Sequence, residues 1–331
     1  MSGPWWSARF MKGESCVSRA SEQKNSYFHS FLLLMTATIW GVAFVAQSVG
    51  MDHVGPITFV AARNVVAVVA LIPVLFYFNH RNARKNVPRP SCDRRTFWTG
   101  GILCGTLLFG GMVTQQIGLV YTTVGKAGFI TTTYVVLVPL LGILLGRKIG
   151  LRMWLAVLLA LAGLYFLCVK QGEFSIGLGD SIVLLCAFFY TIQITCVDYY
   201  VQKIDSIQLN FMQMAVCAVL GSVSAVIFED PSWANLLAAA LPILYAGVCS
   251  SAMGFTFQTV AQEHVSPTVA SLIMSLESCI SAIAGWALLG QVLNNRELWG
   301  CILMFAAIIL SQLPAAFWQS LTVGVRKQSK E

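Results

Sequence analysis

Charged residues are scarce in this sequence. Only 11% of its 331 residues are Asp, Glu, Lys or Arg, whereas 57% are hydrophobic and the mean hydropathy is +0.73. A soluble globular domain carries about 25% charged and about 45–50% apolar residues. This composition excludes a water-soluble enzyme. The net charge of +7 does not indicate a nucleic-acid-binding protein, because the charges lie between hydrophobic segments and form no basic face on a folded domain.

Several motifs typical of enzymes and metal sites are missing. The sequence has no C-x-x-C or C-x-x-H spacing, no H-E-x-x-H or G-x-S-x-G motif and no P-loop. We therefore expect no metal site, no cofactor and no ATP-driven pump. Eight of the ten cysteines lie in apolar runs, where we expect small packing residues and not disulfide partners. These are Cys104, Cys168, Cys186, Cys196, Cys217, Cys249, Cys279 and Cys301.

Hydrophobic runs fill most of the chain. A helix needs about 20 apolar residues to cross the hydrocarbon core of a bilayer, and ten such runs are bounded by charge, glycine or proline. The predicted fold is an all-α integral membrane protein with ten transmembrane helices. They span residues 30–50, 57–78, 98–118, 125–146, 151–170, 179–200, 207–228, 235–257, 267–289 and 297–319.

Lys and Arg are distributed unequally between the two sides of this predicted bundle. Seventeen lie on the side of both termini, three lie on the other side, and Arg63 lies within a predicted helix. Because positive residues concentrate in cytoplasmic loops, we expect a multi-pass protein of the cytoplasmic membrane with both termini in the cytoplasm. Residues 1–29 then form a cytoplasmic arm and not a cleaved signal peptide, and residues 320–331 form a cytoplasmic tail.

The two halves of the chain are weakly similar. The segment from Gly128 aligns with the segment from Ala270 at an offset of 142 residues, and Trp40 aligns with Tyr190 at an offset of 150. Each half contains five predicted helices, and an odd number of spans per copy places the two copies in opposite orientations. This pattern predicts an inverted repeat, which permits alternating access to a site near the bilayer midplane. It is the main physical argument for a transporter.

An ordered set of short motifs runs through both halves. It comprises Trp40-Gly41, Arg63 after Pro56, AGFITTTYVVLVPLL at 127–141, GLGD at 177–180 and ASLIMSLESCISAIAGWALLG at 270–290. Across about residues 30–318 this set resembles the EamA family of the drug/metabolite transporter superfamily. The resemblance implies two five-helix repeats, at 30–173 and 174–319, in a transporter that moves small metabolites and often exports amino acids. Where the family often has a Gly-Glu pair, this sequence has Gly146-Arg147 and Gly290-Gln291.

Glu277 is an acidic residue deep within an apolar run, about ten residues into the ninth predicted helix and next to Ser278. A charge at the bilayer centre costs about 2.5–3.5 kcal/mol on insertion scales. A neutral Glu held by hydrogen bonds within the helix packing is one explanation. We favour a proton or cation site exposed to a cavity, because Gln would serve packing at lower cost. A proton gained at one face and lost at the other would couple transport to a proton gradient.

Five further residues are candidates for the same site, and Ser278, the neighbour of Glu277, is one of them. Arg63 either contacts a substrate carboxylate or forms a structural ion pair. Lys126 is more typical of an interfacial anchor, although it could attract an anionic group. Trp40 either forms an aromatic wall of a cavity or packs in the interior. Gln47 either lines the path or forms an interhelical hydrogen bond. The expected partners are a small-molecule substrate and membrane lipid.

The strongest rival hypothesis is an intramembrane enzyme, because residues 177–180 spell the GxGD of membrane aspartyl proteases. Asp180 is the expected N-cap of the sixth predicted helix. Asp198 lies 18 residues further on, about 27 Å along the same helix, so the two carboxyl groups cannot form a dyad. A second rival, a channel or a non-transporting scaffold, would leave the inverted repeat without an explanation.

Overall fold

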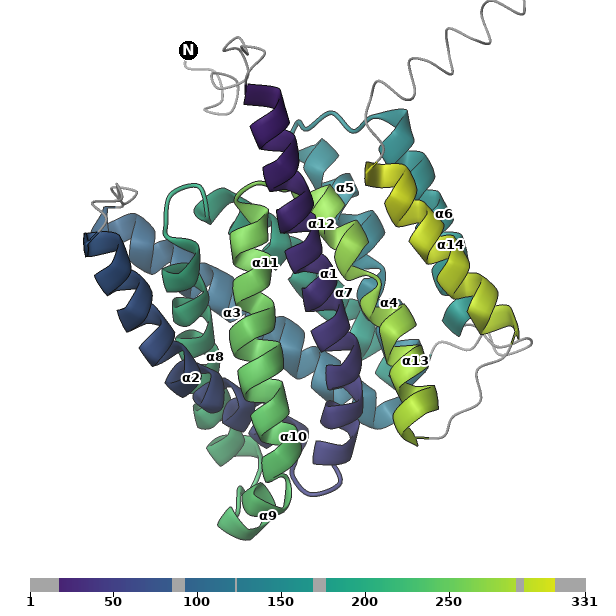
Figure 1. Ribbon diagram of the computed structural model, residues 1–331. Coiled ribbons are helices and arrows are strands. Elements are labelled where there is room, and N and C mark those ends of the chain that lie inside the picture. Colours follow the sequence, from purple (N-terminus) through teal and green to yellow (C-terminus); the bar gives the residue numbers. More distant parts are fainter. Residues whose placement is uncertain (1–17, 85–92, 123, 169–176, 290–294, 313–331) are drawn as a thin grey trace, which may run out of the picture.

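The computed structural model describes residues 18–84, 93–122, 124–168, 177–289 and 295–312, and all regular structure in these ranges is helical. Figure 1 shows the helices as a single bundle. In chain order they are α1 (Ser18–Gly50), α2 (Pro56–Arg84), α3 (Arg94–Tyr121), α4 (Val124–Thr132), α5 (Tyr134–Leu144), α6 (Leu151–Cys168), α7 (Leu178–Tyr200), α8 (Ser206–Phe228), α9 (Trp233–Ala238), α10 (Ala240–Leu244), the π-helix η1 (Tyr245–Gly254), α11 (Phe255–Gln262), α12 (Pro267–Met274), α13 (Glu277–Leu289) and α14 (Asn295–Gln312).

Eight stretches of the described chain are long and apolar enough to cross a membrane. Each overlaps one of the ten spans predicted from the sequence. The two remaining predicted spans, at 151–170 and 297–319, fall on α6 and α14, whose apolar stretches are shorter. The structure thus shows a multi-pass, all-helical membrane protein, and the count of ten remains a prediction.

The bundle is built from close pairs of helices. α3 packs on α7 and α8, α2 packs on α8, and α1 packs on α13, η1 and α11. α6 and α14 pack on each other at one side of the bundle (Figure 1). The start of α1, the end of α2, the start of α3 and the end of α14 lie at the same end of the bundle, at the top of Figure 1. We call this end the N-terminal face.

The outer surface of this bundle differs from that of a water-soluble protein. Large apolar side chains such as Val69, Phe76 and Val226 are exposed on the outside, where a bilayer would surround them. Polar side chains are also buried inside and bond to one another: Gln193 donates to Gln213 and Asn210 donates to Thr256. In lipid, polar groups must be satisfied within the protein, so this arrangement fits a membrane-embedded bundle.

Three predicted helices are not continuous in the structure. The fourth breaks at Thr133, between α4 and α5, and the ninth breaks at Ser275 and Leu276, between α12 and α13. At both breaks a hydroxyl bonds to a carbonyl three residues earlier: Thr133 Oγ1 donates to Ile130 O and Ser275 Oγ to Leu272 O. Such side-chain bonds compete with the regular helical ladder. The eighth predicted helix is divided into α9, α10, η1 and α11. The first predicted helix corresponds to α1, which begins at Ser18 and not at residue 30.

The start of α7 differs in detail from the prediction. Gly177 occupies the N-cap position, and Asp180 is the third helical residue and not the N-cap. The Asp180 carboxylate reaches back to accept a hydrogen bond from the Gly177 N–H at 3.0 Å, and it accepts a second from the Thr122 hydroxyl at 2.5 Å. Asp180 therefore ties the end of α3 to the start of α7, a tertiary role that propensity alone does not indicate.

Candidate functional site

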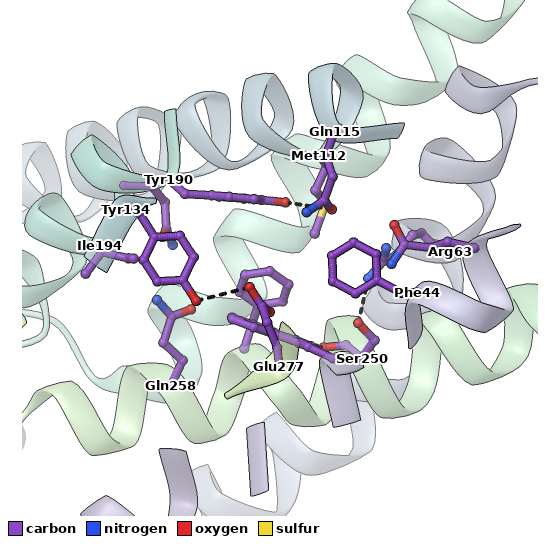
Figure 2. Close-up of a pocket in the computed structure, with 14 residues that line it drawn as sticks. Phe44, Arg63, Met112, Gln115, Tyr134, Tyr190, Ile194, Ser250, Gln258 and Glu277 are labelled. Carbon is purple, nitrogen blue, oxygen red and sulfur yellow. Dashed lines mark hydrogen bonds between the residues drawn. The ribbon is translucent and has the colours of Figure 1, made fainter. Parts of the chain in front are cut away.

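A pocket lies inside the bundle, where α1, α2, α3, α5, α7, η1, α11 and α13 approach one another. Figure 2 shows it with Arg63 at one side of the view and Tyr134 at the other. Its volume is about 40 Å³, room for about three ordered waters, so a metabolite can enter only if the helices move apart. The lining residues are Trp40, Phe44, Gln47, Arg63, Met112, Gln115, Tyr134, Tyr190, Gln193, Ile194, Ser250, Phe255, Gln258 and Glu277.

Glu277 is the first residue of α13, directly after the break that separates it from α12. Its side chain is 4% exposed and lines the pocket. The Tyr134 hydroxyl, at the start of α5, donates a hydrogen bond to Glu277 Oε1 at 3.1 Å (Figure 2). One contact therefore links the two helices that restart after a break, and it leaves the carboxyl group with one hydrogen-bond partner in the described structure.

Arg63 lies on α2 and is 3% exposed. Its guanidinium donates to two serine hydroxyls of η1: Nε to Ser251 Oγ at 3.0 Å and Nη2 to Ser250 Oγ at 2.7 Å. Both serines are buried. Because these partners are neutral, they satisfy two donors of the guanidinium but do not balance its charge.

The two charged groups of the pocket do not pair with each other. Among the described residues, neither Glu277 nor Arg63 has an oppositely charged group within 4.0 Å. A buried charge is costly unless it is paired. The pocket therefore holds one acidic and one basic group that do not neutralise each other.

The residues selected from the sequence are distributed unevenly around this pocket. Trp40 and Gln47 line it, together with Glu277 and Arg63. Ser278 does not line it, but donates to Gly128 O at 3.3 Å and Thr132 Oγ1 at 3.1 Å, so it joins α13 to α4 just before the Thr133 break. The side chain of Lys126 lies outside the described residues, although its backbone belongs to α4.

Sequence reasoning did not select several pocket residues. Tyr134, Ser250 and Gln258 each line the pocket, yet such residues are common in membrane helices and carry no charge. The usable signal was amide side chains within apolar runs: Gln115 and Gln193 line the pocket, like Gln47. Tyr190 aligns with Trp40 in the weak repeat, and both line the pocket. The alignment of Tyr190 with Trp40 is the sequence signal that indicates Tyr190.

The two aspartates of the rival enzyme hypothesis lie at opposite ends of α7, a helix of 23 residues. Asp180 is tied to Thr122, and Asp198 forms an ion pair with Arg147 at 2.6 Å. They share no site. In the described part of the chain, no three His, Cys, Asp or Glu side chains gather as a candidate metal site.

Comparison with known proteins agrees with the fold. The model of the EamA-like transporter family matches residues 28–169 and 177–313, once in each half. Over 282 residues, 85% of this chain and 84% of the relative, the chain is 27% identical to an uncharacterized transporter of Archaeoglobus fulgidus. It is 22% identical over 284 residues to the uncharacterized transporter YoaV of Bacillus subtilis, covering 84% of this chain and 94% of that protein.

The fold also occurs in a solved crystal structure. Its TM-score is 0.70 at 14% sequence identity, and the match covers 86% of this chain and 96% of that one. The resemblance seen in the sequence motifs is thus confirmed by the two family matches, which together span most of the chain. The relatives are named as transporters and not as enzymes. The chain belongs to the EamA-like transporter family.

Proposed function

We propose that this protein is a secondary active transporter that moves small polar metabolites across the cytoplasmic membrane by alternating access. Export of amino acids or related compounds is the favoured activity, on the basis of the family resemblance. The observation that carries the proposal is the pair of buried ionisable side chains, Glu277 and Arg63, which line one pocket and do not pair with each other. An amino acid would complement both: its ammonium group would meet Glu277 and its carboxylate would meet Arg63.

The helix breaks support an inverted repeat. Thr133 and Ser275 differ by 142 positions, the offset at which Gly128 aligns with Ala270. The interrupted helices of the halves 30–173 and 174–319 therefore break at equivalent residues, and they touch through the Tyr134–Glu277 hydrogen bond. Discontinuous helices from two inverted repeats commonly form the midplane site of a secondary transporter. Exchange of the two arrangements would open the pocket to one side and then to the other.

The charge distribution supports an orientation with both termini in the cytoplasm. Basic residues at the ends of α2, α3 and α6, such as Arg84, Arg94 and Arg152, lie on the side that carries 17 of the Lys and Arg residues. Under the positive-inside rule this side is cytoplasmic. The N-terminal face of the bundle is then the cytoplasmic face, and the pocket lies between it and the opposite side.

The first test compares the metabolites inside and outside cells that contain the wild-type protein, the Glu277→Gln variant or neither. We expect the wild-type protein to redistribute at least one small polar metabolite. Glu277→Gln keeps the size of the side chain and can still accept the Tyr134 hydrogen bond, but it removes the charge and the exchangeable proton. The variant should therefore be present in the membrane at wild-type amounts, and its transport rate should be at least tenfold lower than that of the wild type.

The matched control is Asp180→Asn, the same change from carboxyl to amide at a buried position away from the pocket. The Asn oxygen can still accept from the Gly177 N–H, and its NH2 group can donate to the Thr122 hydroxyl, which then acts as acceptor. Transport should therefore remain near the wild-type rate. Wild-type rate and pH dependence in Glu277→Gln would make Glu277 a packing residue. Loss of activity in Asp180→Asn alone would favour the enzyme hypothesis instead.

A further inference from the structure

The π-helix η1 holds the guanidinium of Arg63 in one orientation. Its consecutive residues Ser250 and Ser251 both direct their hydroxyl groups to this side chain. The wider turn of a π-helix changes the angle between successive side chains, and such helices are rare and frequently occur at functional sites. A ten-residue π-helix on the wall of the pocket is therefore a feature that needs an explanation.

Two glycines let η1 approach the pocket residues closely. A Cβ atom on Gly247 would lie 2.8 Å from the backbone oxygen of Arg63, and one on Gly254 would lie 2.6 Å from Nε1 of Trp40. The same indole nitrogen donates to Ser250 O at 3.2 Å. η1 thus fixes the backbone that carries Arg63, the guanidinium itself and the neighbouring aromatic wall, all from one segment.

The serines use only one edge of the guanidinium. Arginine has five N–H donors in a planar fork, and the two that bond to Ser250 and Ser251 come from Nε and Nη2. The edge formed by Nη1 and the second hydrogen of Nη2 has the geometry that binds two oxygens of a carboxylate or a phosphate side by side. No acidic side chain among the described residues lies within 4.0 Å of it.

We infer that Ser250 and Ser251 are positioning residues that aim the free edge of Arg63 into the pocket, where it binds an anionic oxygen group of the transported solute. The inference rests on the proposed function and narrows its substrate class to solutes that carry a carboxylate or a phosphate. Arg63 supplies the charge and the fork. The two serines determine the direction of the fork, and a Lys at position 63 could not reproduce it.

Binding of simple anions to the purified full-length protein tests this inference without knowledge of the natural substrate. Thermal unfolding is measured at constant ionic strength with acetate, benzoate, succinate or inorganic phosphate, and with acetamide, benzamide or succinamide as uncharged counterparts. At least one anion should raise the unfolding temperature, and the amides should not. The carboxylates and phosphate are separate arms, so the stronger one identifies the preferred group.

The variants separate positioning from a merely structural role. Ser250→Ala or Ser251→Ala should raise the half-saturating concentration of the effective anion about tenfold, the equivalent of one charge-assisted hydrogen bond. Ser250→Thr, which keeps the hydroxyl, should restore it. Arg63→Lys and Arg63→Gln should abolish the response. If the two serines had only a structural role, the alanine variants would have a lower unfolding temperature without anion but an unchanged half-saturating concentration.

The inference is overturned if no anion stabilises the wild-type protein more than its uncharged counterpart does, or if both alanine variants respond to anions like the wild type. The second criterion needs only single serine variants, so it holds even where a change at Arg63 prevents folding. Anion binding without metabolite transport in cells would refute the proposed function alone. Transport of a metabolite with no response to any anion would refute this inference alone.

Discussion

Glu263, between α11 and α12 at the N-terminal face, is a carboxyl group outside the membrane-spanning stretches. It accepts a hydrogen bond from the Ser206 hydroxyl, and its neighbour His264 stacks on His29 of α1 with ring centroids 4.1 Å apart. Burial raises the pKa of Glu263, and Asp205 raises it further, whereas the Ser206 hydrogen bond and His29 act in the opposite direction. The folded protein therefore holds this proton more tightly than the unfolded chain does.

The sign of this shift predicts a pH dependence. A carboxyl with a raised pKa favours the folded state on the acidic side, so its contribution to stability falls as pH rises from the ordinary pKa of Glu through the raised one. In thermal unfolding, Glu263→Gln should lose this dependence and gain stability relative to wild type toward neutral pH. If the wild-type protein instead becomes more stable relative to Glu263→Gln as pH rises, the effect of the histidines on the pKa of Glu263 outweighs that of burial.

Single residues of the pocket could be predicted from the sequence where a charged side chain in lipid would cost free energy. Glu277 and Arg63 could be selected because a charge in an apolar run requires a reason, and both line the pocket. Their partners could not be selected. Tyr134, Ser250 and Ser251 are separated from them by 143, 187 and 188 positions, and only tertiary packing brings them together. Binding by any of these residues remains a prediction.

At the scale of helices, α1 and α13 pack closely enough to exclude a side chain. A Cβ atom on Gly41 would lie 2.6 Å from Cβ of Ile280 and 2.8 Å from the backbone oxygen of Glu277. Gly41→Ala should therefore push α13 away from α1 at the pocket, lower the free energy of unfolding by about 1–3 kcal/mol and reduce transport.

The control for this prediction is Gly150→Ala, because nothing lies within 4 Å of a Cβ atom at Gly150. Unfolding in detergent and metabolite transport should match the wild type for this variant. Equal stability of the two alanine variants would contradict the packing of α13 on α1.

A second feature at this scale is the ion pair between Arg147, beyond the end of α5, and Asp198 of α7. Tyr134, Tyr190 and Ile194 line the pocket, and Val138 lies one turn beyond Tyr134 on α5, in the same apolar cluster. Asp198 lies a further turn beyond Ile194. The ion pair therefore links the end of α7 to the segment after α5, beyond this apolar cluster.

Asp198→Asn should loosen this end of the bundle with little loss of stability. The side chains of Arg147 and Asp198 are 39% and 16% exposed, and exposed pairs contribute about 0–1 kcal/mol. Unfolding should change by less than about 1 kcal/mol, whereas alkylation of a cysteine at Val138 should become faster. The exchanged pair, Arg147→Asp with Asp198→Arg, should return alkylation toward the wild-type rate. Unchanged alkylation in Asp198→Asn would remove any role of the pair in closure.

The position of most helices could be predicted from hydrophobic runs, because length and composition determine which segments can cross a bilayer. The breaks at Thr133 and Ser275 and the π-helix η1 could not. They depend on side-chain hydrogen bonds and on glycine contacts between helices, which a hydropathy pattern does not contain. These irregular segments contribute Tyr134, Ser250 and Glu277 to the pocket, whereas the continuous helices α1, α2, α3 and α7 supply nine of its fourteen lining residues.

At the scale of the whole molecule, the family and the all-helical membrane fold follow from the ordered motifs of both halves. Ten spans, the inverted repeat and the cytoplasmic location of the termini remain predictions. They form one connected proposal: if the two halves are inverted copies, the arrangement that closes the N-terminal face must have a counterpart that closes the opposite side. Opening at one face should then always accompany closure at the other.

Accessibility of the pocket from each side of the membrane tests this proposal most directly. The reporter is Met112→Cys, at a pocket position, in a variant whose native cysteines are replaced, and a membrane-impermeant maleimide is added to one side at a time. We predict labelling from both sides, with Asp198→Asn raising the rate from the N-terminal face and lowering it from the opposite side. Rates that rise together from both sides would identify a channel, and absence of labelling from both would identify a non-transporting scaffold; either result would contradict alternating access.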